Sequence, residues 1–379
     1  MNAGSAQAPS PITYASAGVD VAAGDRAVAL MKSSVARAQR PEVLSGLGGF
    51  AGLFDASAIA RMSRPVLATS TDGVGTKVAI AQALDVHDTI GFDLVGMVVD
   101  DIVVCGAEPL FLTDYIACGR LVPERIAAIV GGIAAACQAA GCALVGGETA
   151  EHPGLLGADE YDVAGAATGV VERDELLGPA RVAAGDVVLG IPSSGLHSNG
   201  YSLVRRVVAA AGWMYERHVD ELGRTLGEEL LTPTHVYAAQ LLAVLRARPG
   251  AVHALSHVTG GGLAANLARV LPAGLIARVD RSSWTPPPVF GLIQRLGRVP
   301  QDDVEATLNQ GVGFVALVGP DAAQDVRALL AAEGLDAWVL GEVSQESAYR
   351  VDPRHAVTRG AKGVEGGAVQ VVGEHPAGS

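Results

Sequence analysis

Acidic side chains and histidines stand within or beside five glycine-rich segments of this chain. The segments are residues 46–52, 72–77, 146–149, 194–200 and 259–262. Glycine lets backbone N–H groups approach anionic oxygens closely and adopts positive φ without strain. One such segment is usually a tight turn, but five of them beside Asp, Glu, His or Lys predict a shared site for phosphate or metal.

Three carboxylates are candidate Mg²⁺ ligands: Asp72, Asp101 and Glu148. Asp72 ends a predicted strand, which is where α/β proteins place ligands. Asp101 and its neighbour Asp100 lie in an otherwise apolar helix, and a buried carboxylate is costly unless it is paired or binds a metal. Mg²⁺ usually bridges one or two carboxylates to substrate phosphates. Helix capping and ion pairing are the alternatives, and for Asp100 and Glu148 they explain the pattern equally well.

His197 and His257 both adjoin glycine-rich segments and are the candidates for proton transfer. The imidazole pKa lies near neutrality, so a loop histidine can accept and return a proton at physiological pH. The alternative for each is a histidine that only hydrogen-bonds the backbone. The sequence leaves open which of the two would be the general base.

The elements that must position these groups alternate along the chain. The predicted strands are 65–71, 161–171 and 187–191, and the predicted helices are 93–104, one from about residue 199, and one after residue 262. Repeated units of strand, glycine loop and helix indicate an α/β protein in two halves. The predicted division is a flexible leader at 1–11, an N-terminal domain at 12–178, a C-terminal domain at 179–345 and a flexible tail at 346–379, where apolar periodicity is lost.

Composition disfavours several other classes of protein. With 27 Lys and Arg against 40 Asp and Glu, the net charge of −13 repels nucleic-acid backbones. No P-loop motif GxxxxGK[ST] is present, and Ala51 breaks a near-match to the dinucleotide-binding motif GxGxxG. Four cysteines without CxxC spacing predict free thiols in a reducing cytoplasm. The apolar stretch 126–147 is interrupted by Gly141, which favours a buried helix, turn and strand over a membrane span.

Seven motifs follow one another in an order that identifies a family. They are SGLGGF at 45–50, TDGVGTK at 71–77, GAEPL at 106–110, GGETAE at 146–151, HSNGYSL at 197–203, HVTGGG at 257–262 and NQGVG at 309–313. Over about residues 12–345 the chain resembles the phosphoribosylformylglycinamidine cyclo-ligases, also called aminoimidazole ribonucleotide synthetases. The resemblance implies an N-terminal α/β domain, with strands in a β-barrel at a homodimer interface, and a C-terminal α/β domain packed against it.

The resemblance also implies a reaction of de novo purine biosynthesis in the cleft between the domains. ATP would phosphorylate the formyl amide oxygen of formylglycinamidine ribonucleotide, and the ring-forming nitrogen would then displace phosphate to give aminoimidazole ribonucleotide. Phosphoryl transfer depends largely on positioning and electrostatics, so ATP and Mg²⁺ are the expected cofactors. Whether K⁺ is needed stays open.

The family motifs assign a role to each residue that matches them. The catalytic residues would be His197, His257 and Asp101, and the metal ligands Asp72, Asp101 and Glu148. Nucleotide would be bound by Lys32, Gly46, Gly48, Gly49, Phe50, Asp72, Gly73 and Lys77, and substrate by Glu148, Thr149, Ser198, Asn199, Gly260, Gly261 and Asn309. Many members carry Asn-Asp where this chain has Asp100 and Asp101, so we expect Asp101→Asn to be far more damaging than Asp100→Asn.

Two alternatives keep the fold and change the function. The first is another ATP-using enzyme of the same superfamily, such as thiamine-monophosphate kinase or selenophosphate synthetase. The latter would need a reactive cysteine near its N-terminus, whereas the first cysteine here is Cys105. The second is a non-catalytic nucleotide-binding scaffold, which predicts broken motifs. The HSNGYSL motif favours the cyclo-ligase over the sister enzymes. The scaffold is disfavoured because the motifs are intact, with all of their charged and histidine residues present: Asp72, Lys77, Asp101, His197 and His257.

Overall fold

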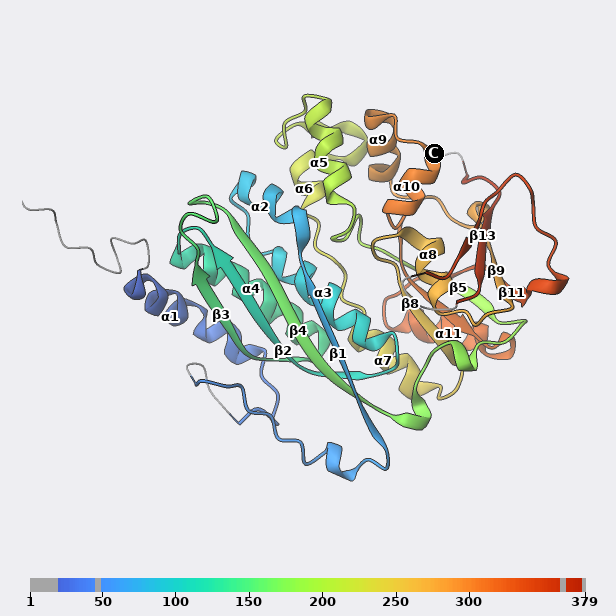
Figure 1. Ribbon diagram of the computed structural model, residues 1–379, viewed down its shortest axis with the longest axis horizontal. Coiled ribbons are helices and arrows are strands. Elements are labelled where there is room, and N and C mark those ends of the chain that lie inside the picture. The colour runs from blue at the N-terminus through green and yellow to red at the C-terminus, as the bar shows by residue number, and fades with distance from the viewer. Residues whose placement is uncertain (1–19, 45–48, 362–365, 377–379) are drawn as a thin grey trace, which may run out of the picture.

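The computed structural model describes residues 20–44, 49–361 and 366–376, which form two α/β halves connected by residues 173–186 (Figure 1). The N-terminal half holds a four-stranded sheet in the order β1-β4-β2-β3. Its strands are β1 (Pro65–Gly73), β2 (Glu108–Cys118), β3 (Ala143–Glu151) and β4 (Tyr161–Glu172). β1 and β2 pair antiparallel with β4, and β3 pairs parallel with β2.

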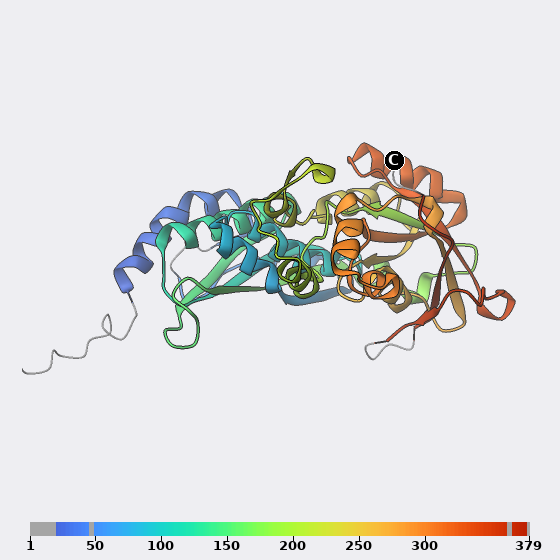
Figure 2. The ribbon, with the colours of Figure 1, turned by 90° about the horizontal axis from the view of Figure 1, so that it is seen from above.

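Helices cover one face of this sheet, and Figure 2 shows them gathered on a single side. They are α1 (Val21–Arg37), α2 (Val78–Leu84), α3 (Ile90–Val103) and α4 (Pro123–Ala140). α3 contacts β1 and β4 on one side and α4 on the other, which explains why its sequence is apolar nearly all round. Gly91 permits this packing, because a Cβ there would lie 1.9 Å from the backbone nitrogen of Ile133.

The C-terminal half is a seven-stranded sheet flanked by helices. Its strand order is β12-β13-β9-β11-β5-β10-β8. The strands are β5 (Val187–Pro192), β8 (Val252–His257), β9 (Leu275–Asp280), β10 (Val312–Val318), β11 (Trp338–Gln345), β12 (Val357–Arg359) and β13 (Ala368–Val372), with a separate pair, β6 (His218–Val219) and β7 (Arg224–Thr225). The helices are α5 (Tyr201–Ala210), α6 (Leu226–Leu230), α7 (Ala238–Ala247), α8 (Gly262–Arg269), α9 (Pro288–Gly297), α10 (Gln301–Thr307) and α11 (Ala323–Ala332).

The prediction of a flexible tail at 346–379 is wrong for the described part of that stretch. β13 pairs parallel with β9 and antiparallel with β12, so it is an inner strand of the sheet. Gln370 at its centre is fully buried, and its amide nitrogen donates to the carbonyl oxygens of Asp352 (2.7 Å) and His355 (2.8 Å). Its amide oxygen accepts from the Tyr349 hydroxyl and from the Asp352 N–H. A buried but fully bonded glutamine in a strand of five residues defeats a prediction that depends on apolar periodicity.

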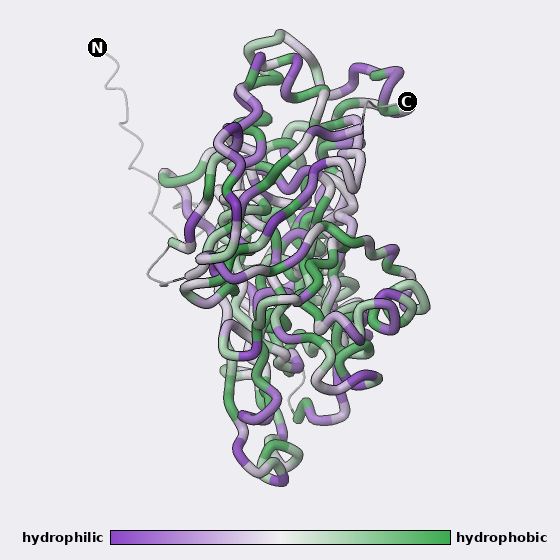
Figure 3. Tube along the Cα trace, turned by 90° about the vertical axis from the view of Figure 1, so that its right-hand side faces the viewer, coloured by the Kyte–Doolittle hydropathy of each residue, from purple (hydrophilic) through white to green (hydrophobic). Residues whose placement is uncertain are grey.

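The stretch 126–147 has the predicted structure. It comprises most of α4, a turn at Gly141 with φ +70°, and the first half of β3. Within the described ranges, no helix is both long enough and apolar enough to cross a membrane. In Figure 3 hydrophobic and hydrophilic segments alternate along the chain, and several peripheral loops carry hydrophilic stretches.

Candidate active site

Helix α3 positions three carboxylates where the two halves meet. Asp93 accepts hydrogen bonds from Lys77 and Thr234. Asp100 accepts the backbone N–H of Tyr237, and Asp101 is hydrogen-bonded to His257. α3 belongs to the N-terminal half but also contacts α7 and β8 of the C-terminal half. One apolar helix therefore sets the position of polar groups on both sides of the junction.

Asp101 and His257 form a carboxylate–imidazole pair. Asp101 Oδ1 lies 3.0 Å from His257 Nδ1, and the carboxylate side chain is 46% exposed while the imidazole is buried. Because a carboxylate can only accept, the neutral imidazole carries its proton on Nδ1. Its Nε2 is then unprotonated, and within the described chain this buried atom has no hydrogen-bond partner. The arrangement is that of a base oriented by an acid.

In His197 the ring nitrogen without a partner among the described residues is the protonated one, whereas in His257 it is the unprotonated one. Its Nε2 accepts the backbone N–H of Ser194 at 3.1 Å, so the neutral ring carries its proton on Nδ1. Nδ1 is buried and meets no partner among the residues the structure describes. Burial, reinforced by the neighbouring His257, Lys77 and His235, lowers the pKa of His197 well below its usual value. His197 therefore offers a hydrogen-bond donor, whereas His257 offers an acceptor.

The backbone at His197 is held in the left-handed region, with φ 60°. Non-glycine residues seldom adopt this conformation, and it costs on the order of 1–3 kcal/mol, so it is found where the surroundings impose it. Gly313 provides room for the ring, because a Cβ there would lie 1.9 Å from the Tyr237 hydroxyl oxygen and 2.9 Å from His197 Cε1. Gly313, the second glycine of the NQGVG motif, thus lets His197 pack against the backbone of β10.

An aromatic wall connects the two histidines. The ring centroids are 6.0 Å apart for His197 and Tyr237, 5.1 Å for Tyr237 and Phe314, and 5.0 Å for Phe314 and His257, which are stacked. Tyr237 is fully buried and its hydroxyl donates to the Pro192 carbonyl at 2.6 Å. The donor and the acceptor are therefore mounted on one rigid apolar surface.

Asp100 points away from this pair. Its two oxygens accept the N–H of Tyr237 at 3.0 and 3.2 Å, at the N-terminus of α7. Burial raises the pKa of this fully buried carboxyl to about 7, despite the opposing influence of His257. Of the alternatives open for Asp100, the structure supports helix capping.

The loops named by the HSNGYSL, HVTGGG and NQGVG motifs are brought together by their own side chains. Asn199 Oδ1 accepts the N–H of Gly260 at 2.9 Å, adjacent to Gly261, which has φ +108°. Asn309 donates to the carbonyl of Gly195 at 2.9 Å, and the Ser198 hydroxyl donates to the carbonyl of Val74 at 2.7 Å. These residues, proposed to bind substrate, here hold the loops of the junction against one another.

Other predicted residues lie elsewhere. Asp72 pairs with Gly165, against which Leu94 of α3 packs, and Leu94 lies seven residues before Asp101 on the same helix. Glu148 and Thr149 lie on β3, where the exposed Glu148 carboxylate accepts the N–H of Thr149, and Lys32 is exposed on α1. Gly46 and Gly48 lie outside the described residues. Gly49 and Phe50 are exposed, and Gly73 ends β1 beside Asp72.

These positions bear on the metal prediction. No three His, Cys, Asp or Glu side chains within the described ranges lie close enough to hold one ion, so Asp72, Asp101 and Glu148 do not form a single cage. Mg²⁺ keeps several waters and binds through one or two carboxylates plus phosphates. The half-exposed Asp101 fits an ion that arrives with a nucleotide better than a permanently bound one.

Lys77 does not have the surroundings expected of a phosphate ligand. It is fully buried, and its ammonium group donates to Asp93 Oδ1 (2.7 Å), the His197 carbonyl (3.0 Å) and the Thr232 carbonyl (2.7 Å). An ammonium has three donors, and all three are used. The structure therefore gives Lys77 no donor for a phosphate.

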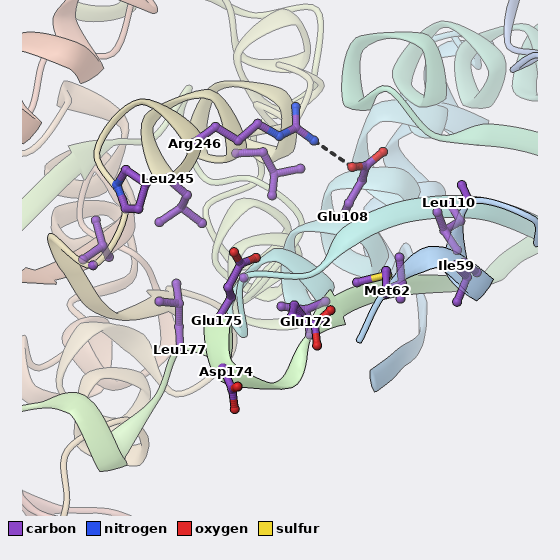
Figure 4. Close-up of a pocket in the computed structure, with 18 of the residues that line it drawn as sticks. Ile59, Met62, Glu108, Leu110, Glu172, Asp174, Glu175, Leu177, Leu245 and Arg246 are labelled. Atoms are coloured by element: carbon purple, nitrogen blue, oxygen red, sulfur yellow. Dashed lines mark hydrogen bonds and ion pairs between the residues drawn. The ribbon is translucent and has the colours of Figure 1, made fainter. Parts of the chain in front are cut away.

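Of a small and a large cavity in the described structure, only the small one is lined by predicted site residues. A cavity of about 250 Å³ is lined by Asp101, His257, Ser256, Asn266 and Arg269 with Val104 and Val270. A cavity of about 790 Å³ lies near the start of β2 and the end of α7, where Ile59, Met62 and Leu245 form apolar walls (Figure 4). Its carboxylates outnumber its arginines, and Arg246 is paired with Glu108 at 2.7 Å. A triphosphate would be repelled there, so we place the candidate active site at Asp101 and His257.

Sequence reasoning missed two residues that organise this site. Asp93 shares the apolar helix with Asp100 and Asp101, and the cost of a buried carboxylate could have identified it. Tyr237 gave no signal, because nothing in its local sequence shows that its ring lies between two distant histidines.

Both α/β halves match the AIR synthase related proteins. The N-terminal domain model of that family matches residues 54–171, and the C-terminal domain model matches residues 183–352. The chain belongs to the phosphoribosylformylglycinamidine cyclo-ligase family, as its similarity to curated members shows.

Curated cyclo-ligases match almost from end to end. The protein of Desulfitobacterium hafniense (strain DSM 10664 / DCB-2) is 51% identical over 335 residues, which is 88% of this chain and 97% of the relative. The protein of Shouchella clausii (strain KSM-K16) is 51% identical over 332 residues, or 87% of this chain and 95% of the relative. The family expected from the seven motifs is thereby confirmed.

Solved structures share the fold at low sequence identity. Thiamine-monophosphate kinase from Stenotrophomonas maltophilia K279a has a TM-score of 0.62 at 21% identity and covers 92% of this chain and 97% of its own. The hydrogenase maturation protein HypE in complex with ATP has a TM-score of 0.59 at 20% identity and covers 93% and 95%. These similarities confirm the mixed α/β two-domain fold.

Proposed function

We propose that the junction between the two halves carries out ATP-dependent closure of the imidazole ring of aminoimidazole ribonucleotide. The chain is an ATP-dependent cyclo-ligase of purine biosynthesis, since curated enzymes of that name are about half identical to it over nearly their whole length. The observation that carries the assignment to this site is the pairing of Asp101 with His257 beside a cavity at the junction.

The chemistry requires one group that removes a proton and one that stabilises negative charge. The formyl amide oxygen of formylglycinamidine ribonucleotide takes the γ-phosphoryl group of ATP, which releases ADP. The ring-forming nitrogen then attacks the activated carbon and loses a proton, and the C–O bond breaks to release phosphate. Holding both reactants in place supplies much of the rate.

The two histidines divide these tasks. His257 Nε2 is the free acceptor, and Asp101 holds the ring in the tautomer that leaves Nε2 unprotonated, so His257 is the general base. His197 presents Nδ1–H and is neutral at pH 7, so it donates a hydrogen bond to an oxygen that gains negative charge. On the question that the sequence left open, the ring nitrogens that lack partners in the described structure thus favour His257 as the general base.

Mg²⁺ would be carried in with ATP, with Asp101 Oδ2 as one protein ligand, and would neutralise phosphate charge. Asp72 at the end of β1 is a second carboxylate available to a more distant phosphate. Nucleotide binding also stays proposed for the exposed residues Lys32, Gly49 and Phe50, and for Gly46 and Gly48, which lie outside the described residues.

A homodimer and a cytoplasmic location complete the proposal. The face of the N-terminal sheet turned toward the viewer in Figure 1 carries no helix of the described chain, and Leu67 and Tyr115 on the sheet are 63% and 41% exposed. An apolar sheet face of this kind fits a β-barrel formed with a second copy. Four free cysteines fit a reducing cytoplasm.

The test is a coupled assay with formylglycinamidine ribonucleotide, ATP, Mg²⁺ and either K⁺ or Na⁺. We expect the aromatic amine of the product and ADP to appear in equal amounts. ADP without amine would indicate a sister phosphotransferase, and neither product from folded protein would support a scaffold. Activity with K⁺ but not with Na⁺ would show that the enzyme requires K⁺.

A further inference from the structure

Lys77 and Asp93 form a fully buried ion pair that joins four segments of the chain. Lys77 follows β1, Asp93 lies in α3, and both side chains are 0% exposed. Asp93 Oδ1 also accepts the N–H and the hydroxyl of Thr234, at 3.0 and 2.7 Å. The remaining two donors of Lys77 reach the carbonyls of His197 and Thr232. Two of the four segments, 193–200 and 232–235, belong to the C-terminal half.

The contact with the His197 carbonyl is the informative one. This carbonyl belongs to a residue with φ 60°, so the orientation of its peptide plane determines where the imidazole points. The ring is fixed at a second point, because Nε2 accepts the Ser194 N–H. Ser194 is itself bonded to the 232–235 segment, since its hydroxyl donates to the Pro233 carbonyl at 2.7 Å and accepts the His235 N–H at 3.1 Å.

We propose that Lys77, with Asp93, is a positioning residue that holds the His197 loop in its reactive conformation, rather than a ligand of the nucleotide phosphates. The term "reactive" rests on the proposed function, whereas the hydrogen bonds that Lys77 and Asp93 make are observed independently of that function. A buried ammonium can orient two carbonyls at once because its three donors are tetrahedrally disposed around one charge. A displacement of about 1 Å at a reacting group costs on the order of 100-fold in rate.

The decisive variant removes both charges. Lys77→Met alone leaves Asp93 buried and unpaired, so it lowers the melting temperature as well as activity. Lys77→Met combined with Asp93→Asn is neutral, and the asparagine oxygen can still accept from Thr234. We expect the double variant to regain most of the melting temperature, to keep a kcat about 100-fold below the parent, and to keep KM for ATP within about threefold.

A second readout is independent of catalysis. Hydrogen–deuterium exchange of a peptide covering residues 193–200 should be faster in the double variant, because the Ser194 N–H loses its fixed acceptor. The matched control is Asp186→Asn, which removes a carboxylate that accepts from Ala183 N–H (3.0 Å) and contacts His253 (2.8 Å) elsewhere in the C-terminal half. Asp186→Asn should lower stability without changing kcat or exchange in 193–200.

Each outcome decides the matter. If kcat recovers together with the melting temperature, the pair serves stability alone. If kcat is kept and KM for ATP rises tenfold or more, Lys77 binds phosphate. If exchange in 193–200 equals that of the parent, the pair does not hold the loop. Absence of cyclo-ligase activity in the parent protein would overturn the proposed function. The exchange comparison would still test whether Lys77 and Asp93 hold the loop at 193–200.

Discussion

The junction between the two halves and the outer edge of the C-terminal sheet both bury polar side chains, but they satisfy them differently. At the outer edge Gln370 is fully buried and makes four hydrogen bonds. At the junction His197 Nδ1, His257 Nε2 and Asp93 Oδ2 are buried without partners in the described structure. Buried polar atoms are nearly always paired, so those left unpaired mark places where the fold forgoes stability. The comparison teaches that burial alone does not distinguish the two regions; they differ in that Gln370 is fully bonded, whereas the two histidines of the junction each keep one ring nitrogen without a partner in the described structure.

The largest effect is expected at the pair that we assign to proton transfer. Asp101→Asn and His257→Gln should each lower kcat by roughly 10²–10⁴-fold, the usual contribution of a positioned base, with little change in melting temperature. Steady-state assays of both variants test this. Asp100→Asn is the control on the same helix, and equal losses at positions 100 and 101 would contradict the assignment.

A smaller loss of kcat is expected for a substitution that shifts the His197 ring but keeps the histidine. In Gly313→Ala the new Cβ would lie 1.9 Å from the Tyr237 hydroxyl oxygen, so the aromatic wall must shift. We expect kcat to fall about 10–100-fold and the free energy of unfolding to fall by about 1–3 kcal/mol. Gly319→Ala, beyond the other end of β10, meets only His253 at 3.5 Å and should do neither. Unchanged kcat in Gly313→Ala would separate His197 from the reaction.

Asp100→Asn should change stability rather than catalysis. Burial raises the folded pKa of Asp100 from 3.8 to about 7, so the folded state prefers the protonated carboxyl. The stabilising contribution of this group is complete below about pH 3.8 and is lost as pH rises through 7, by at most about 4 kcal/mol. Asparagine is neutral and can still accept the Tyr237 N–H, so the variant should gain stability over the parent as pH rises. Denaturant unfolding at pH 5, 6.5 and 8 measures this gap, and a gap independent of pH would contradict the inference.

The smallest effect on activity belongs to the outer edge of the sheet. Gln370→Leu leaves the Tyr349 hydroxyl and three backbone groups without their partner, so the free energy of unfolding should fall by about 1–3 kcal/mol while kcat is unchanged. The exposed Gln324→Leu is the matched control and should change neither quantity. A loss of kcat in folded Gln370→Leu protein would break the contrast between the two regions.

Much of the fold could be predicted from local patterns. The strands that contain 65–71, 161–171 and 187–191 exist, and so does the helix–turn–strand unit that begins at Pro123, because glycine, proline and apolar runs act over a few residues. The tail could not be predicted, because β13 is held by Asp352, His355 and Tyr349, and those contacts involve residues 15 to 21 positions away.

The sequence by itself determined the family, the α/β class and a set of candidate site residues, because motifs and periodicity are local properties of the chain. Only the tertiary structure decided which partners those residues have. It directed Asp100 to α7 and Asp101 to His257, although the two are adjacent in sequence. It also left different ring nitrogens of the two histidines without a partner in the described chain, Nδ1 in His197 and Nε2 in His257. The physical reason is that the partners of Asp100 and Asp101 lie 137 and 156 residues away, and only packing of the two halves brings them together.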